Sequence, residues 1–188
     1  MIELCILVKK AGALMVIRKA TKHDLDGIAA VYEAIHDEEE VGHAEIGWVR
    51  GVYPTRETAK ASMERGDLFV LEEAGTILGA AIINQIQVDR YAGMPWAHAV
   101  PDDRVCVLHT LVIHPKVSGK GYGTAFVRFY EDYAMRSGWP ELRLDTNARN
   151  RSARALYARL GYTEVGSAQT VFNGIPGVEL VMLEKCIG

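Results

Sequence analysis

A glycine-rich turn between an apolar strand and an amphipathic helix constrains the fold of this chain more than any other feature. Three glycines fall within five residues, at Gly119, Gly121 and Gly123. Glycine lets the backbone turn sharply and approach a ligand closely. The helix that follows directs unpaired N–H groups and the positive end of its dipole into the turn. The sequence therefore predicts a site for phosphate or pyrophosphate where strand, turn and helix meet.

The spacing of these glycines excludes two common phosphate-binding motifs. The dinucleotide-binding fingerprint requires G-x-G-x-x-G, but Thr124 follows Gly123 where that pattern needs its third glycine. The mononucleotide-binding P-loop requires G-x-x-x-x-G-K-[ST], a run that the chain does not contain. A dehydrogenase is therefore a poor interpretation, also because the glycine turn comes late in the chain.

The turn and the strand before it resemble the acetyl-CoA motif of the GNAT superfamily of N-acetyltransferases. In that family a strand ending in L-x-V-x-P is followed by roughly [RQ]-x-x-G-x-G-[AG] and a helix. Here residues 111–115 (LVIHP) match the first part and residues 117–123 (VSGKGYG) match the second. Val117 or Ser118 stands where the family usually has arginine or glutamine. The resemblance therefore implies that pyrophosphate contacts come from the backbone.

A later block resembles a second motif of the same family, N-x-x-A-x-x-L-Y-x-x-x-G-[FY]. The matching residues are Asn150, Ala153, Leu156, Tyr157, Gly161 and Tyr162. Together the blocks imply an α+β protein with the GNAT fold, in which helices flank a mixed central β-sheet, and acetyl-CoA as the co-substrate. The acetyl-CoA contacts implied in this way are Leu111, Val112, Ile113, Ser118, Gly119, Lys120, Gly121, Tyr122, Gly123, Thr124, Asn150 and Tyr157.

Hydrophobic periodicity and capping residues predict an order of elements that agrees with this fold. Helices are expected over 22–37, from Pro54–Thr55 to Gly66, from the glycine turn to Ser137–Gly138, and from Asn150 to Gly161. Strands are expected over 14–19, 67–72, 76–87, 104–113, 141–146, 162–165 and 178–184, and 89–103 is expected to be a loop.

Acetyl transfer from a thioester to an amine needs a neutral amine, a donor to the oxyanion and an acid for the departing thiolate. Tyr157 is the candidate acid, because a tyrosine pKa of about 10 is workable against a thiol pKa of about 8.5. The alternative is a core tyrosine with its hydroxyl at a polar rim. His109 is the candidate base or proton relay, since strand alternation from Val105 to Ile113 places it one step before the acetyl-CoA contacts. Its alternative is a hydrogen-bonded core histidine.

The acceptor side of the site is expected around the acidic run 37–40 (DEEE), because the family places its acceptor loop there. Glu39 and Glu40 would attract a cationic amine, whereas the alternative is a solvated helix end. The aromatic and polar residues of the predicted loops are candidates for the wall of the acceptor pocket, namely Trp48, Arg50, Tyr53, Trp96 and Asn173.

Length and composition limit the remaining possibilities. The 188 residues, 49% of them apolar, favour a single domain. Residues 15–25 (MVIRKATKHDL) resemble the usual start of a GNAT domain, which implies an N-acetyltransferase domain over 15–188, with 1–14 as an N-terminal extension or the product of an upstream start. A net charge of −3 does not indicate a nucleic-acid-binding protein, which is usually basic. No apolar run in the sequence is long enough to span a membrane. Three widely spaced cysteines, Cys5, Cys106 and Cys186, suggest reduced thiols in a cytoplasmic protein without a metal site.

The sequence thus predicts an acetyl-CoA-dependent N-acetyltransferase that transfers the acetyl group directly to a primary amine of a small molecule or a peptide. Neither nucleic acid nor a membrane is expected as a partner, and a homodimer is left open. The alternative is a non-catalytic acyl-CoA-binding sensor or a partner-binding domain that keeps the glycine turn.

Overall fold

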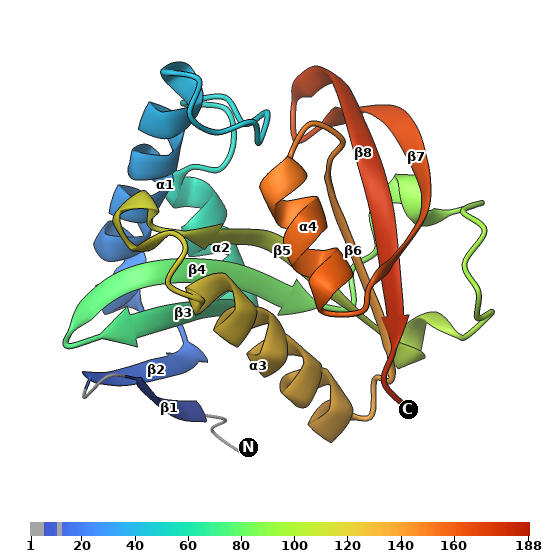
Figure 1. Cartoon of the computed structure of the whole chain (residues 1–188), viewed down its shortest axis with the longest axis horizontal. Helices are drawn as coiled ribbons and strands as arrows, with labels where there is room; N and C mark the ends of the chain where they lie inside the picture. Colours follow the sequence, from blue (N-terminus) through green and yellow to red (C-terminus); the bar gives the residue numbers. More distant parts are fainter. Residues whose placement is uncertain (1–5, 11–12) are drawn as a thin grey trace.

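The computed structural model describes residues 6–10 and 13–188. An eight-stranded sheet with the order β1-β2-β3-β4-β5-β6-β8-β7 forms its centre (Figure 1). The strands are β1 (Ile6–Lys10), β2 (Ala13–Lys19), β3 (Leu68–Glu73), β4 (Thr76–Asn84), β5 (Val105–Ile113), β6 (Glu141–Asn147), β7 (Thr163–Phe172) and β8 (Ile175–Cys186). The helices are α1 (Leu25–Glu40), α2 (Arg56–Arg65), α3 (Tyr122–Ser137) and α4 (Arg151–Arg159).

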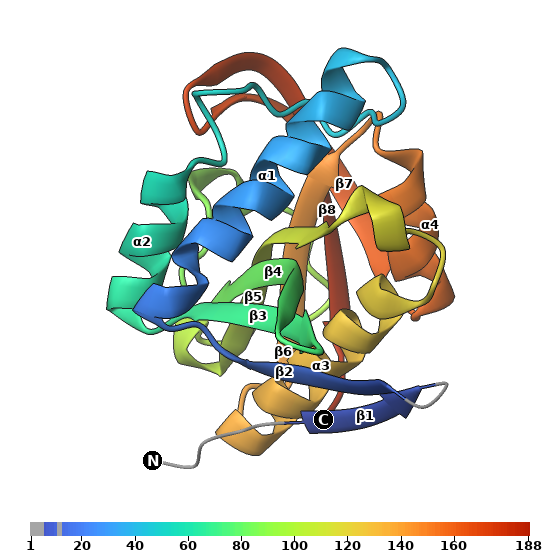
Figure 2. The same ribbon diagram turned by 90° about the vertical axis from the view of Figure 1, so that its left-hand side faces the viewer.

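Helices cover both faces of this sheet, as expected for an α+β protein. Figure 2 shows α1 and α2 side by side on one face, where their apolar side chains pack against β3 and β4. On the other face α3 and α4 contribute Phe126, Phe129, Tyr130 and Tyr157 to the largest apolar cluster. All neighbouring strands are antiparallel except β5 and β6, so the sheet is mixed, as predicted.

Local capping residues set the helix boundaries largely as predicted. Thr55 caps the start of α2 by accepting a hydrogen bond from the Thr58 N–H, and Gly66 ends that helix in the left-handed conformation. Asn150 caps α4 in the same way, accepting from the Ala153 N–H at 3.1 Å. The acidic run continues α1 to Glu40, so it extends the helix by about one turn beyond the expected end.

The last two strands are longer than predicted, because a hairpin turn joins them directly. Asn173 and Gly174 both have positive φ, 49° and 84°, as a two-residue type I′ turn requires. The Asn-Gly pair is a strong hairpin signal in a sequence, but the expected strands end at 165 and resume at 178, which leaves both residues of the pair outside them. The hairpin extends β7 to Phe172 and places that side chain beside the site described below.

A bulge in β5 and a divergence from β6 together open the sheet. The β4–β5 register shifts between Ala80 and Ile82, opposite Thr110, whose φ is 50°. β5 and β6 pair only as far as Leu108 and Leu144, although both strands continue beyond these residues. The unpaired ends of the two strands therefore separate and leave room between them.

The N-terminal segment adds to the edge of the sheet. β1 pairs with β2 in an antiparallel register from Ile6–Ile17 to Lys10–Ala13. The boundary expected after residue 14 falls inside β2, and residues 1–5 and 11–12 of the expected extension lie outside the described residues. Within the part of the chain that the structure describes, no helix has the length and apolar character needed to cross a membrane.

Candidate functional site

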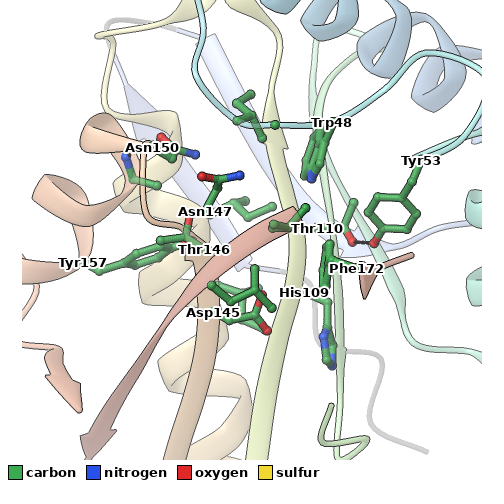
Figure 3. Close-up of a pocket in the computed structure, with 17 residues that line it drawn as sticks. Trp48, Tyr53, His109, Thr110, Asp145, Thr146, Asn147, Asn150, Tyr157 and Phe172 are labelled. Atoms are coloured by element: carbon green, nitrogen blue, oxygen red, sulfur yellow. Dashed lines mark hydrogen bonds between the residues drawn. The ribbon is translucent and has the colours of Figure 1, made fainter. Parts of the chain in front are cut away.

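A pocket of about 80 Å³ occupies the gap between the diverging ends of β5 and β6. Its walls come from β5, β6, α4, the loop before α2 and the β7–β8 hairpin (Figure 3). A wider hollow of about 340 Å³ adjoins the pocket, because both are lined by Gly47, Trp48, Asn147 and Val178. A concave site with apolar walls and a few polar groups is the usual form of a small-molecule site.

Three aromatic rings form one wall of this pocket. Tyr53 packs edge-on against Trp48, with ring centroids 6.0 Å apart, and against Phe172, with centroids 5.8 Å apart. The Tyr53 hydroxyl is hydrogen-bonded to the Thr110 hydroxyl at the bulge. Burial raises the pKa of Tyr53 to about 12, so this residue stays protonated. Trp48 thus lines the pocket, and its role in holding an acceptor stays a prediction.

Asp145, near the end of β6, is the carboxylate of the pocket. Its Oδ2 accepts a hydrogen bond of 2.9 Å from the Tyr91 hydroxyl. Burial raises the pKa of Asp145 to about 6, and the hydrogen bond from Tyr91 opposes part of that rise. A carboxyl group with a pKa near 6 is mostly ionised at neutral pH, yet it is a stronger base than an ordinary aspartate.

Tyr157 reaches the pocket from α4, beside Thr146 in Figure 3. Its hydroxyl makes no hydrogen bond to any of the described residues, although the side chain is only 6% exposed. Burial, aided by the Asp145 carboxylate, holds the pKa of Tyr157 well above its usual range. A buried tyrosine hydroxyl ordinarily finds a partner, so Tyr157 is available as a hydrogen-bond donor to a ligand.

His109 also lines the pocket, but its ring points away from Trp48 and Thr110 (Figure 3). The expected alternation along the whole strand is wrong, because the bulge at Thr110 interrupts it. Val105 and Val107 face one apolar cluster, whereas Leu111 and Ile113 face the opposite one, on the α3 side.

A hydrogen-bond chain fixes the His109 ring. The Asn84 amide donates from Nδ2 to Asp67 Oδ2 at 2.8 Å, so its Oδ1 faces His109 Nε2 at 3.1 Å and that nitrogen donates. Burial lowers the pKa of His109 to about 4, which makes the imidazole a weak base. These contacts favour the hydrogen-bonded core histidine, the alternative left open above, over a proton relay.

The glycine turn lies exposed in front of α3. Gly119 and Gly121 have φ of 73° and 82°, in the left-handed region, and Gly121 is the N-cap of this helix. Gly123 lies against α4, where a Cβ would come within 3.3 Å of Leu156 Cδ2. The turn therefore presents the N-terminus of a 16-residue helix beside the diverging strands.

The side chains of two expected acetyl-CoA contacts are engaged elsewhere in the protein. Val112 is 3% exposed within the α1 cluster, and the Tyr122 hydroxyl donates to Glu73 Oε1 at 2.9 Å. These two residues can therefore offer only backbone groups to a ligand. Leu111 and Asn150 line the pocket, and Ser118 and Lys120 are exposed in the turn.

The acidic run is bound within the protein. Arg50 pairs with Glu33, Asp37 and Glu40, and Glu38 contacts His43 at 3.1 Å. Glu39 accepts hydrogen bonds from the N–H groups of Ile46 and Gly47, at 2.6 and 2.8 Å. Arg50 therefore neutralises Glu40, and Glu39 holds the loop that carries Trp48. Because both carboxylates already have partners within the protein, they are less able to attract a cationic amine.

Trp96 lies outside the candidate pocket. Its ring packs against Tyr91 at 5.2 Å and lies under the Arg143 guanidinium at 4.2 Å. It lines a separate hollow, under the loop between β4 and β5. The expectation that Trp96 lines the acceptor pocket is therefore not met.

Asp145 and Phe172 are pocket residues that the sequence did not single out, whereas Tyr53 was among the loop residues expected to shape the acceptor pocket. Asp145 is the last of three charged residues, after Glu141 and Arg143, that alternate with leucine in the expected strand, so this pattern alone does not distinguish it as a pocket residue. Phe172 had a usable signal, because the Asn-Gly turn that follows it predicts the long hairpin.

Comparison with known proteins agrees with this geometry. A family model described as acetyltransferase (GNAT) family matches residues 28–162. An uncharacterized N-acetyltransferase of Methanocaldococcus jannaschii is 26% identical over 151 residues, which make up 79% of this chain and 60% of the relative. The match thus spans less than two thirds of the length of that relative.

Solved structures share the whole fold. A GNAT-family acetyltransferase from Streptococcus agalactiae 2603 has a TM-score of 0.75 at 21% identity, covering 92% of this chain and 95% of that one. YncA of Salmonella typhimurium, solved with its cofactor acetyl-CoA, has a TM-score of 0.65 at 20% identity, covering 93% and 94%. The expected GNAT fold is confirmed, and since the family model covers most of the chain, this protein belongs to the acetyltransferase (GNAT) family.

Proposed function

We propose that the protein is an acetyl-CoA-dependent N-acetyltransferase that acetylates a primary amine of a small molecule or a peptide by direct transfer. The observation that carries this proposal is the pocket between β5 and β6 behind the glycine turn. It brings together Asp145 and the Tyr157 hydroxyl, which makes no hydrogen bond within the described parts of the chain. The free thiols of Cys106 and Cys186 support a reducing compartment such as the cytoplasm.

The residues present fit acetyl-CoA. The left-handed Gly119 and Gly121 and the N-terminus of α3 suit its pyrophosphate, and the unpaired end of β5 offers backbone groups to its amide-containing arm. Acetyl-CoA supplies the acetyl thioester when it is bound. The side chains of Ser118 and Lys120 are exposed to solvent, so they would contribute less to acetyl-CoA binding than the backbone groups of the turn.

The chain's own groups then divide the proton chemistry between them. Ionised Asp145 accepts a proton from the attacking amine, directly or through water, because its raised pKa makes it the strongest carboxylate base in the pocket. The Tyr157 hydroxyl donates a hydrogen bond to the departing sulfur. Its raised pKa makes complete proton transfer costlier than for an ordinary tyrosine, so hydrogen bonding is its main role.

The acceptor amine would enter past the aromatic wall. An ammonium group is attracted to the faces of Trp48 and Tyr53 and to the Asp145 carboxylate behind them. The same wall would suit an amine with an apolar or aromatic body. A non-catalytic acyl-CoA sensor is the competing interpretation, and the Asp145–Tyr157 arrangement favours the enzyme, because binding alone does not require either group.

Adding a side chain at Gly121 is expected to abolish measurable acetyl-CoA binding. Gly121→Val places a branched Cβ at a left-handed N-cap where the pyrophosphate must approach. Gly138→Val is a matched control, because Gly138 caps the other end of the same helix with φ of 77° and no atom within 4 Å of an added Cβ. Calorimetry with acetyl-CoA distinguishes the two variants, and equal affinity in folded Gly121→Val and Gly138→Val would place the site elsewhere.

Removing the Glu39 carboxylate is expected to raise KM for the amine by about 10-fold and to leave acetyl-CoA affinity unchanged. Glu39→Ala leaves the Ile46 and Gly47 N–H groups without an acceptor and frees the Trp48 loop, a loss of roughly 1.5–3 kcal/mol for each charged hydrogen bond. Glu39→Gln keeps an acceptor and should retain much of the affinity. If KM instead rises with salt and both variants behave alike, the acidic run 37–40 attracts the cationic amine through its charge.

A further inference from the structure

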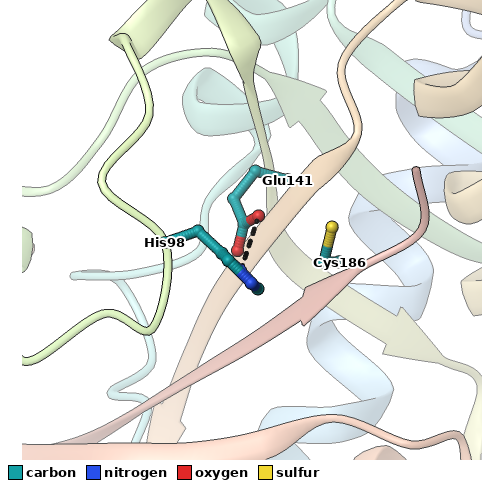
Figure 4. Close-up of side chains that lie close together, drawn as sticks. All are labelled: His98, Glu141 and Cys186. Atoms are coloured by element: carbon teal, nitrogen blue, oxygen red, sulfur yellow. Dashed lines mark ion pairs between the residues drawn. The ribbon is translucent and has the colours of Figure 1, made fainter.

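Three potential metal ligands meet at the end of β6 opposite the pocket. His98 comes from the loop between β4 and β5, Glu141 begins β6, and Cys186 ends β8 (Figure 4). Glu141 and Cys186 are cross-strand partners, so the sheet register itself sets them side by side. One nitrogen, one oxygen and one sulfur atom of the three side chains lie within 4.8 Å of one another.

Glu141 is the buried member of this group and lacks a full set of partners. Its side chain is 1% exposed, and Oε2 lies 3.3 Å from His98 Nδ1. Its Oε1 is buried and accepts no hydrogen bond from any residue in the described parts of the chain. A buried carboxylate oxygen without a donor or a cation is costly, so the site calls for a further positive partner.

The neighbouring charges do not supply that partner. Arg143 lies next along the same face of β6 and attracts both Glu141 and Glu184, its cross-strand neighbour. Its guanidinium donates to Gln87 Oε1 at 2.7 Å and to the His98 carbonyl at 3.4 Å, not to either carboxylate. Two buried carboxylates thus face one guanidinium, and His98, whose Nδ1 lies 3.3 Å from Glu141 Oε2, balances the second negative charge only when it is protonated.

We propose that His98, Glu141 and Cys186 form a binding site for a single Zn²⁺ ion, with water as the fourth ligand. Imidazole, carboxylate and thiolate together are the ligands that zinc takes, whereas Mg²⁺ and Ca²⁺ prefer oxygen alone. Zinc–ligand bonds of about 2.0–2.3 Å in a tetrahedron place the donor atoms roughly 3.3–3.8 Å apart. The exposed His98 and Cys186 side chains can close the remaining distance by rotation, while Glu141 stays fixed in the sheet.

Such an ion would tie the loop between β4 and β5 to the end of β8. That loop also supplies Tyr91, which holds Asp145, and Ala97, whose N–H donates to Glu184 Oε1 at 2.9 Å. The site lies at the far end of β6 from the acetyl-transfer pocket and contributes no residue to it. Its role is structural and does not depend on the proposed activity.

The test uses the full chain after removal of metal with a chelator. Titration with Zn²⁺ in a calorimeter is expected to show one equivalent bound, and Co²⁺ in its place is expected to give thiolate-to-cobalt absorption. At about 100-fold excess over Kd, bound Zn²⁺ should raise Tm by roughly 5–10 °C. Cys186→Ser and His98→Ala should each weaken Zn²⁺ binding by more than about 10-fold and remove the shift in Tm.

Two control variants, one matched to Cys186→Ser and one to His98→Ala, test whether Zn²⁺ binds at other thiols or imidazoles. Cys5→Ser removes another thiol and His23→Ala removes another exposed imidazole, and both should retain full Zn²⁺ binding. Unchanged Zn²⁺ affinity in Cys186→Ser, equal losses in the matched variants, or the absence of stoichiometric binding in the unmodified chain would each overturn the proposal. In the last case His98 and Glu141 form only an ion pair.

Discussion

Replacing Asp145 with asparagine is expected to lower kcat/KM by about 10²–10⁴-fold, the usual contribution of a positioned acid or base. The Asp145→Asn change preserves the shape of the side chain and an acceptor for the Tyr91 hydroxyl, but it removes the basic oxygen from the pocket. Release of free thiol from acetyl-CoA with a saturating amine measures the effect. Asp132→Asn, on the exposed face of α3, should keep full activity.

The pH profile gives this prediction a second signature. Because Asp145 must be ionised to act as a base, kcat/KM should rise with pH through about 6 in the unmodified protein. Asp145→Asn should lose that rise. A profile that keeps its inflection near 6 in this variant would assign the base to another group.

The same substitution is expected to make the protein more stable at pH 7. Burial raises the pKa of Asp145 from 3.8 to about 6, so the folded state holds the proton more tightly than the unfolded state. The ionised carboxyl group therefore destabilises the folded state. This destabilisation is absent below pH 3.8 and reaches its full value, about 3 kcal/mol, above pH 6. Asp145→Asn should therefore raise the denaturation midpoint at pH 7 but not at pH 3.5.

Removing the Tyr157 hydroxyl is the second large expected effect, a fall in kcat of about 10²–10³-fold with acetyl-CoA affinity nearly unchanged. Tyr157→Phe keeps the ring that packs in the α3–α4 cluster and removes only the hydroxyl, which has no hydrogen-bond partner among the described residues. A donor that acts on the departing sulfur matters in the transition state and little in the bound ground state.

Tyr162→Phe is the matched control for this change. The Tyr162 ring lies edge-on to Tyr157, with centroids 5.8 Å apart, but it does not line the pocket. The kcat of Tyr162→Phe should stay within about twofold of that of the unmodified protein. Equal kcat in Tyr157→Phe and the unmodified protein would remove Tyr157 from the mechanism and favour the core-tyrosine alternative.

The features that the sequence predicted well depend on interactions between near neighbours in the chain. The glycine turn, the Asn150 cap and the helix ends at Gly66 and Gly138 follow from backbone conformations that a few adjacent residues decide. Hydrophobic spacing determined which face of each helix packs inward. Because the two motif blocks depend on the same local spacing, the family and the fold could be predicted without the structure.

Other features depend on strand pairing. The bulge at Thr110 reverses which face of β5 its later residues occupy, and no residue near it in the sequence signals this change. For that reason Leu111 and Ile113 do not share a face with Val105 and Val107, as uninterrupted alternation through His109 predicts. The long β7–β8 hairpin, which brings Phe172 to the pocket, was in contrast signalled by Asn173 and Gly174.

The electrostatic character of the site was decided only by the tertiary structure. The acidic run looked like a free patch of charge, but Arg50 and the 46–48 loop bind its carboxylates. Asp145 gains its raised pKa from burial between strands that are far apart in the sequence. The free energy of a charged group depends on desolvation and on partners brought from distant segments, and neither is encoded in the residues beside it.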